Sequence, residues 1–182
     1  MGRPASGHEG ERNLMEYVDL DARTGDLSGV LDPTPYLDHL PSIAGELPPG
    51  ARAFATDPAH YDFRGLRCVK DLELRHLRVT GTDGDALEAR FLHNCWKHDA
   101  DLVIRYTGVA RWSTTIPAAE DLSTLILDEV LPHPRGCRHE AAFRDGTLTV
   151  VCRDLDAVWT EALCRTGGGG PCRGRGRTRV TR

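Results

Sequence analysis

Two Asp-Gly pairs, each placed between runs of alternating residues, restrict the fold of this chain more than any other feature of its sequence. Asp83-Gly84 stands between the runs 72–79 and 87–93, and Asp145-Gly146 stands between 138–143 and 148–155. Apolar residues at every second position are typical of a strand that buries one face. Asp-Gly suits the tightest hairpin turns, because both residues tolerate positive φ. Each pair therefore predicts a β-hairpin.

Further alternating segments extend the predicted sheet. Residues 102–106 and 125–131 predict one strand each, and weaker strands are predicted at 17–20 and 51–55. Between Leu74 and Leu77 the phase of alternation shifts, which indicates a β-bulge. The stretch 110–124 predicts a connection with at most one helical turn.

Helical spacing is clearest over residues 34–47, where Leu37, Leu40, Ile43 and Leu47 recur, and the apolar positions of 125–131 also fit a short helix. Because successive strands are joined by short turns, we expect an α+β fold that is mainly an antiparallel β-sheet, a meander of about 5–7 strands, with one or two short helices. Composition predicts a disordered N-terminal extension over 1–14, a single β-rich domain over 15–164 and a disordered Gly/Arg-rich tail over 165–182.

The charge distribution argues against a nucleic-acid groove on the folded part. The net charge is −4, but six arginines and no acidic residues lie in 165–182, which leaves 17 basic and 27 acidic residues in 1–164. Phosphate binding depends on clusters of Lys and Arg, which an acidic body disfavours.

No apolar run approaches the roughly 20 residues that span a bilayer. With no secretory signal in the first 16 residues, we expect a soluble, cytoplasmic protein that has free thiols or a metal rather than disulfides.

Two segments, 93–99 and 132–139, carry the side chains that bind metals or react as nucleophiles. Thiolate and imidazole are the usual zinc ligands, and Cys95-x-x-His98 has an acceptable ligand spacing. If every consecutive pair of strands is antiparallel, both segments lie at one edge of the sheet, together with Asp154. Zinc is therefore a possible cofactor, and a Cys beside a His could instead form a reactive thiolate. Two alternatives remain: Cys95 and Cys137 are ordinary buried thiols, or they form a disulfide. The predicted metal-ligand set is His93, Cys95, His98, Cys137 and His139.

Loop residues outside this set favour recognition. Trp96, Asp99, Arg105 and Trp112 are candidate binding residues, because loops on a rigid scaffold often carry binding. The chain has none of the hydrolase, zinc-protease, Walker or dinucleotide motifs. The leading hypothesis is a non-catalytic domain that binds a protein or small ligand through loops 93–99 and 132–139. The alternative is a zinc or reactive-thiol site in the same loops, and the third is RNA binding through the Arg-Gly tail.

Overall fold

The computed structural model of the 182-residue chain describes residues 15–24, 27–117 and 123–162. The predicted extension 1–14 and tail 165–182 lie outside the described residues. No helix within the described ranges has the length and apolar character needed to cross a bilayer.

The helices are α1 (Thr34–Ile43) and α2 (Pro49–Ala55), with a 3-10 helix at Ala44–Glu46. The strands are β1 (Asp19–Thr24), β2 (Leu27–Asp32), β3 (Glu73–Thr80), β4 (Ala86–Leu92), β5 (Ala100–Thr107), β6 (Arg111–Thr114), β7 (Ser123–His133), β8 (Gly136–Phe143), β9 (Gly146–Cys152) and β10 (Asp154–Glu161).

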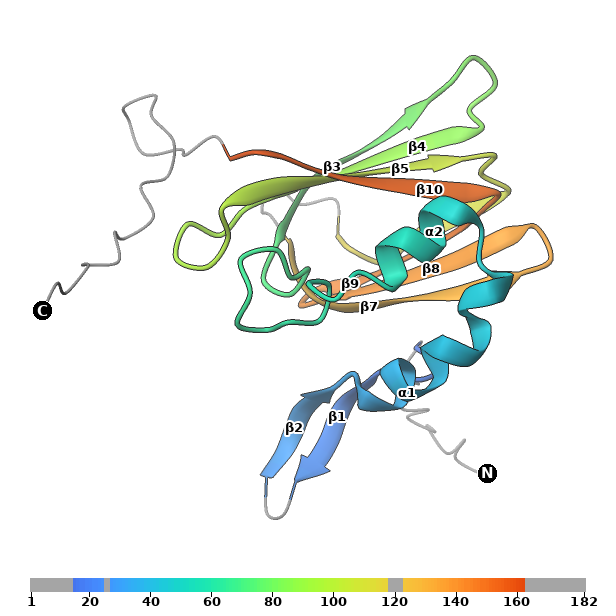
Figure 1. The fold of residues 1–182 in the computed structure, drawn as a ribbon. Helices are drawn as coiled ribbons and strands as arrows, with labels where there is room; N and C mark the ends of the chain where they lie inside the picture. The colour runs from blue at the N-terminus through green and yellow to red at the C-terminus, as the bar shows by residue number, and fades with distance from the viewer. Residues whose placement is uncertain (1–14, 25–26, 118–122, 163–182) are drawn as a thin grey trace, which may run out of the picture.

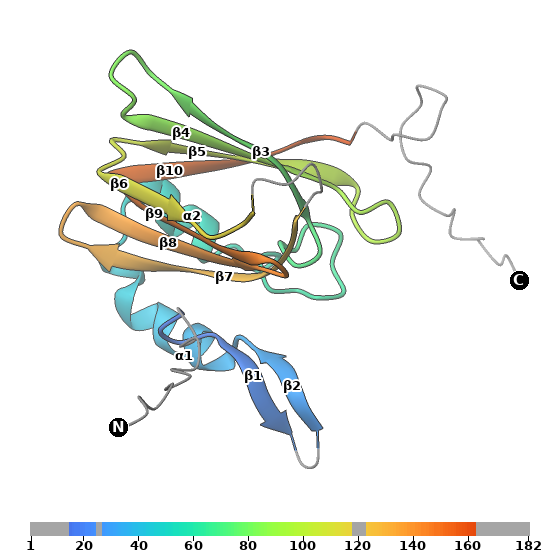
Figure 2. The ribbon, with the colours of Figure 1, turned by 180° about the vertical axis from the view of Figure 1, so that it is seen from behind.

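Eight of these strands form one antiparallel sheet in the order β10-β5-β4-β3-β7-β8-β9-β6, and β1 and β2 form a separate hairpin. The pairing of β3 with β7 consists of Glu73 with Thr124 and Leu74 with Ser123. Beyond this short junction the sheet separates into two halves, and the half with β4, β5 and β10 lies over the half with β7, β8 and β9 (Figures 1 and 2). The predicted α+β fold with a mainly antiparallel sheet is confirmed.

The core fills the space between the two halves. Leu87, Ala89 and Phe91 alternate along β4 and are buried, as their spacing predicted. The Phe91 ring stacks on that of Phe143 from the opposite half, with 6.2 Å between the ring centroids. Both predicted Asp-Gly hairpins form. The predicted bulge is also present, since the register of β3 against β4 shifts between Leu74 and His76.

The strand predicted at 51–55 is wrong, because this segment lies within α2. Ala51, Phe54 and Ala55 are all buried, at the i, i+3, i+4 spacing of one helical face. The carboxylate of Asp154 accepts hydrogen bonds from the N–H groups of Gly50 at 3.2 Å and Ala51 at 2.9 Å. These two donors have no partner within the helix, so Asp154 stabilises its first turn. The helix contacts β10 and β7, one strand from each half of the sheet (Figure 1).

The connection predicted at 110–124 contains a strand, β6. It pairs antiparallel with β9 from Arg111 opposite Val151 to Thr114 opposite Leu148. All four of its residues are exposed, so the sequence shows no apolar alternation there. The extra strand reverses the direction in which the chain enters β7. Every later strand end therefore lies at the opposite end of the sheet from the one predicted.

Between its junction with β3 and its C-terminal end, β7 has side chains as hydrogen-bond partners on its free edge. The Tyr36 hydroxyl donates to the Val130 carbonyl at 2.9 Å and accepts from the Val130 N–H at 3.1 Å. The Tyr61 hydroxyl donates to the Asp128 carbonyl. The Glu129 carboxylate accepts hydrogen bonds from the N–H groups of residues 16–18. The contacts of the two tyrosines satisfy backbone groups of β7 that a neighbouring strand would otherwise pair, whereas the Glu129 side chain binds the backbone of residues 16–18.

Candidate functional site

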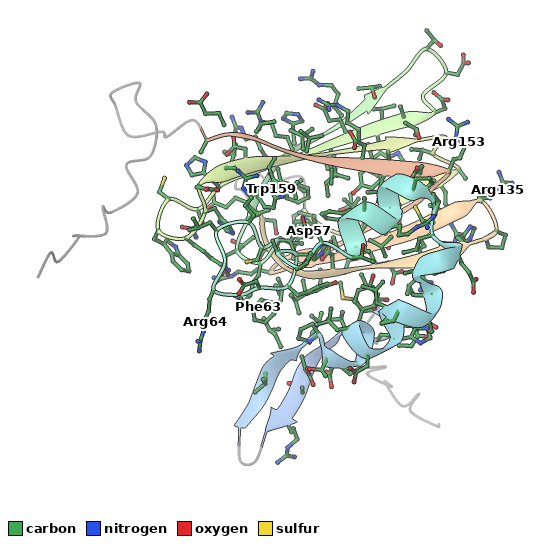
Figure 3. All side chains as sticks on the ribbon, in the orientation of Figure 1. Asp57, Phe63, Arg64, Arg135, Arg153 and Trp159 are labelled. Carbon is green, nitrogen blue, oxygen red and sulfur yellow. The ribbon has the colours of Figure 1, made fainter. Side chains whose placement is uncertain are left out.

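The two loops predicted to share one edge lie at opposite ends of the sheet. Loop 93–99 leads into Ala100, which pairs with Glu161, whereas the other end of β5, Thr107, pairs with Asp154. The β7–β8 turn lies at this second end, because Cys137 pairs with Cys152 and the next residue, Arg153, donates its N–H to the Thr107 carbonyl at 3.0 Å. In Figure 3 the side chains of Arg135 and Arg153 lie at the opposite end of the molecule from Arg64. The prediction of a common edge is wrong, and β6 is the reason.

The five predicted metal ligands are therefore not brought together. His93, Cys95 and His98 lie at the loop 93–99 end, Cys137 lies near the β7–β8 turn, and His139 is buried between the two halves. Cys137 and Cys152 place their Sγ atoms 3.6 Å apart. Within the described residues, no group of three or more His, Cys, Asp or Glu side chains could hold a metal ion.

Each of the three histidines in that set uses both ring nitrogens in hydrogen bonds. In His98, Nδ1 accepts the Asn94 N–H at 3.1 Å, and Nε2 lies 3.1 Å from the carbonyl oxygens of Cys68 and Lys70. The His93 ring lies between Asp101 and Cys95. The His139 ring lies between Tyr106 and Asp128. A metal ion would have to displace one of these partners at each position.

The four predicted binding residues are also divided between surfaces. Trp96 and Asp99 belong to loop 93–99, where the Asp99 carboxylate lies 3.6 Å from the Arg67 guanidinium. Arg105 is on β5 and pairs with Glu88 at 3.1 Å. Trp112 is on β6, opposite Val150. Of the four, Trp96 and Asp99 lie in the same loop.

Loop 93–99 and the segment 63–71 together form a surface with a groove of about 340 Å³. The Trp96 side chain is 76% exposed and that of Leu66 is 56% exposed, which makes them the two most exposed large apolar side chains among the described residues. Phe63 and Arg64 lie on the same segment (Figure 3). We call this the loop surface, and its groove is lined by Phe63, Arg64, Leu66, Lys70, Asp71, Trp96 and Lys97.

Polar contacts that are mostly half-buried fix the two parts of the loop surface to each other. The Asp71 carboxylate accepts hydrogen bonds from Lys70 at 2.7 Å and from Lys97 at 3.0 Å. Burial raises the pKa of Asp71, but the two lysine hydrogen bonds outweigh it and hold the pKa below its ordinary value. His98 joins the same two segments through the carbonyls of Cys68 and Lys70, and burial lowers its pKa to about 4. His98 is therefore neutral near pH 7 and acts as a structural hydrogen-bonding group.

A second polar cluster is fully buried and centres on Asp128 of β7. His60 Nε2 lies 2.7 Å from Oδ1 of Asp128, and His139 Nε2 lies 3.0 Å from Oδ2. The cluster continues through His139 Nδ1 to the Tyr106 hydroxyl at 2.8 Å. His60 Nδ1 lies 3.1 Å from the Phe54 carbonyl at the end of α2. The cluster thus joins both halves of the sheet, α2 and the segment that leads to the loop surface.

The partners of these rings determine their protonation. A carbonyl and an ionised carboxylate can only accept, so both nitrogens of His60 donate, and His60 is an imidazolium cation. His139 needs one proton, on Nε2, because its Nδ1 can accept from the Tyr106 hydroxyl. Burial raises the pKa of Asp128, but the charge of His60 and the hydrogen bonds from both histidines hold it well below its ordinary value. The cluster therefore contains one positive and one negative charge, each compensated by the other.

Sequence reasoning missed Asp128, His60, Tyr61 and Tyr106. One available signal was the pair Asp128-Glu129 within the apolar run 125–131. Acidic residues inside a strand that is buried on both faces require partners, because an unpaired buried charge is prohibitively costly. His60 lies in a loop with no periodic pattern, and nothing local indicates its partner 68 residues away.

No protein-family model matches the chain, and no curated protein matches it.

Replacing Asp128 with Asn tests the charge pairing. The substitution leaves the buried His60 cation without its counter-charge, so we expect the free energy of unfolding in urea to fall by about 3–5 kcal/mol. Asp156→Asn is the matched control, because Asp156 is an exposed residue of β10 and its loss should change stability by about 0.5 kcal/mol or less. Equal effects of the two substitutions would show that the cluster carries no compensated charge.

The lowered pKa of His98 predicts a pH-dependent loss of stability. Between pH 6.5, the ordinary pKa, and about 4, the unfolded chain binds a proton at His98 that the folded chain does not bind. Stability should therefore decrease as pH falls through this window, with no contribution from His98 above it. His98→Asn keeps an acceptor near the Asn94 N–H but does not titrate, so urea unfolding of this variant should depend less steeply on pH between 4 and 6.5. Identical slopes for the variant and the unmodified protein would contradict the assignment.

Proposed function

We propose that this protein is a binding domain and that the loop surface recognises a protein partner. The observation that carries the proposal is the exposure of Trp96 and Leu66, at 76% and 56%, beside one groove. Exposed apolar side chains that gather at one place mark interaction sites more often than single exposed residues do. Tryptophan is also among the residues that most often dominate the energy of protein interfaces.

The polar contacts of Asp71 and His98, which fix the two parts of the loop surface to each other, support this function. Trp96 is flanked by residues whose backbone and side chains are held by Asn94, His98 and Asp71. A surface that is already ordered loses little conformational entropy on binding, so more of its contact energy appears as affinity.

Charge at the rim indicates the chemistry of the partner. Within the described part of the chain, Lys70 and Lys97 are paired with Asp71, and Arg67 is paired with Asp99, whereas the Arg64 guanidinium has no ion pair. Figure 3 shows Arg64 pointing away from the body of the protein. We therefore expect the partner to place an apolar side chain against Trp96 and an acidic group near Arg64.

The loop surface contains one of the two predicted loops. The β7–β8 turn lies at the other end of the sheet, so residues 132–139 cannot contact the same small epitope. Zinc binding has no assembled ligand set among the described residues. RNA binding through the Arg-Gly tail concerns residues outside those that the structure describes.

The test requires first a partner and then a matched pair of variants. A photo-cross-linking residue at position 66 of the full chain, used in cells that naturally produce the protein, captures a polypeptide that is then purified. Trp96→Ala should weaken its binding, measured by calorimetry, by about 30-fold, which corresponds to about 2 kcal/mol.

Trp112→Ala is the control, because Trp112 is also exposed but belongs to β6 on the other half of the sheet. We expect this variant to bind as tightly as the unmodified protein. An equal loss of affinity in both variants, or unchanged affinity in Trp96→Ala, would exclude the loop surface as the binding site.

A further inference from the structure

Next to the loop surface, three side chains form a relay that ends at an exposed thiol. The Asp101 carboxylate is fully buried, and its Oδ1 lies 2.6 Å from Nδ1 of His93. On the other side of the ring, Nε2 of His93 lies 3.2 Å from Sγ of Cys95, which is exposed. The same Asp101 oxygen accepts the His93 N–H at 2.9 Å, and Arg90 contacts the other oxygen at 3.3 Å.

This order of groups is the arrangement that activates a nucleophile. An ionised carboxylate only accepts, so Nδ1 of His93 carries the proton, and Nε2 faces the thiol as a base. Because Asp101 is bound by both the backbone and the ring of His93, it fixes the orientation of that base. A thiol within hydrogen-bond reach of a base that is itself held by a third group is the general signature of covalent catalysis.

Four backbone N–H groups of loop 93–99 are already used in hydrogen bonds within the loop, which favours an electrophile that needs no such donors. Acyl transfer requires donors aimed at a developing oxyanion, and these are often backbone N–H groups. In loop 93–99 the N–H of Asn94 donates to His98, that of Trp96 donates to Asn94 Oδ1, and those of Lys97 and His98 donate to the Asn94 carbonyl. Thiol–disulfide exchange needs no such donors, because its negative charge is distributed over sulfur atoms.

From these contacts we infer that Cys95 is a nucleophile for thiol–disulfide exchange, with His93 as its base and Asp101 as a positioning residue. The Cys95 proton moves to Nε2 of His93, and the thiolate attacks one sulfur of a disulfide R–S–S–R. The new bond joins Sγ of Cys95 to that sulfur, and the old S–S bond breaks with its electron pair on the leaving RS⁻. His93 returns the proton to this thiolate, so that the products are Cys95–S–S–R and RSH. The Cys95 sulfur is oxidised and the leaving sulfur is reduced.

This site is independent of partner binding, so the two proposals fail separately. The experiment treats the full chain with glutathione disulfide, a small anionic disulfide, and in a parallel arm with cystamine, a small cationic one. Mass spectrometry of the tryptic peptide 91–97 follows Cys95 alone, which separates it from the other cysteines of the chain. We expect Cys95 to form the mixed disulfide at pH 7 at least about 10-fold faster than an ordinary exposed thiol.

The reference thiol is Ser113→Cys in a Cys95→Ser background, because Ser113 is an exposed residue of β6. His93→Gln should lower the Cys95 rate at pH 7 by about 10-fold and make it rise more steeply between pH 7 and 9, as the rate of an unassisted thiol does. Asp101→Asn should change the pH profile in the same direction. Thermal unfolding identifies any variant that does not fold. If Asp101→Asn does not fold, the rate and pH profile of His93→Gln decide the test.

Two results would overturn the inference. One is a Cys95 rate at pH 7 that does not exceed that of the Ser113→Cys reference. The other is a folded His93→Gln variant whose rate and pH profile match those of the unmodified protein. A higher rate with only one of the two disulfides supports the inference and identifies the charge that the site prefers.

Discussion

The contact between His60 and Asp128 is the interaction on which the rest of the structure depends. Four parts of the chain are joined around this carboxylate. It belongs to β7 and is bound by His139 of β8 and by His60, while Tyr106 of β5 binds His139 and His60 also contacts the Phe54 carbonyl at the end of α2. All of these side chains are buried, so each has to find its partner within the protein. A buried charge without its counterpart costs several kcal/mol, which strongly disfavours alternative arrangements of these elements.

The same contact explains how an exposed apolar surface can be held in place. His60 and Tyr61 fix the start of the segment that continues through Phe63 and Leu66, and the His60 carbonyl accepts the Val69 N–H at 3.2 Å. From there Asp71 and His98 connect the segment to loop 93–99. The proposed binding surface and the Cys95 thiol therefore lie on segments that the same set of polar contacts holds in place. Within this set, neutral His98 and charged His60 have different environments and different roles.

Local patterns predicted the parts of the fold that local chemistry determines. A few adjacent residues determine each of these parts: the Asp-Gly turns, the alternation in β4 and the phase shift at the bulge of β3. The four exposed residues of β6 carry no such pattern, and because strand direction is counted cumulatively, this one omission moved residues 132–137 to the wrong end of the sheet. Segment 51–55 is too short for alternation and helical spacing to be told apart, and its helix depends on Asp154, about 100 residues away. For the site, the sequence indicated loop 93–99 with His93, Cys95 and Trp96, but which groups Asp101, Asp71 and Asp128 contact follows only from the tertiary structure.

The charge of His60 tests the central claim most directly. Nitrogen NMR of the histidine rings in the folded protein at pH 7 distinguishes a nitrogen that carries a proton from one that does not. The account requires both nitrogens of His60 to be protonated and requires His139 to carry one proton, on Nε2. A neutral His60 with a single protonated nitrogen would contradict it, since the buried carboxylate of Asp128 would then have no counter-charge.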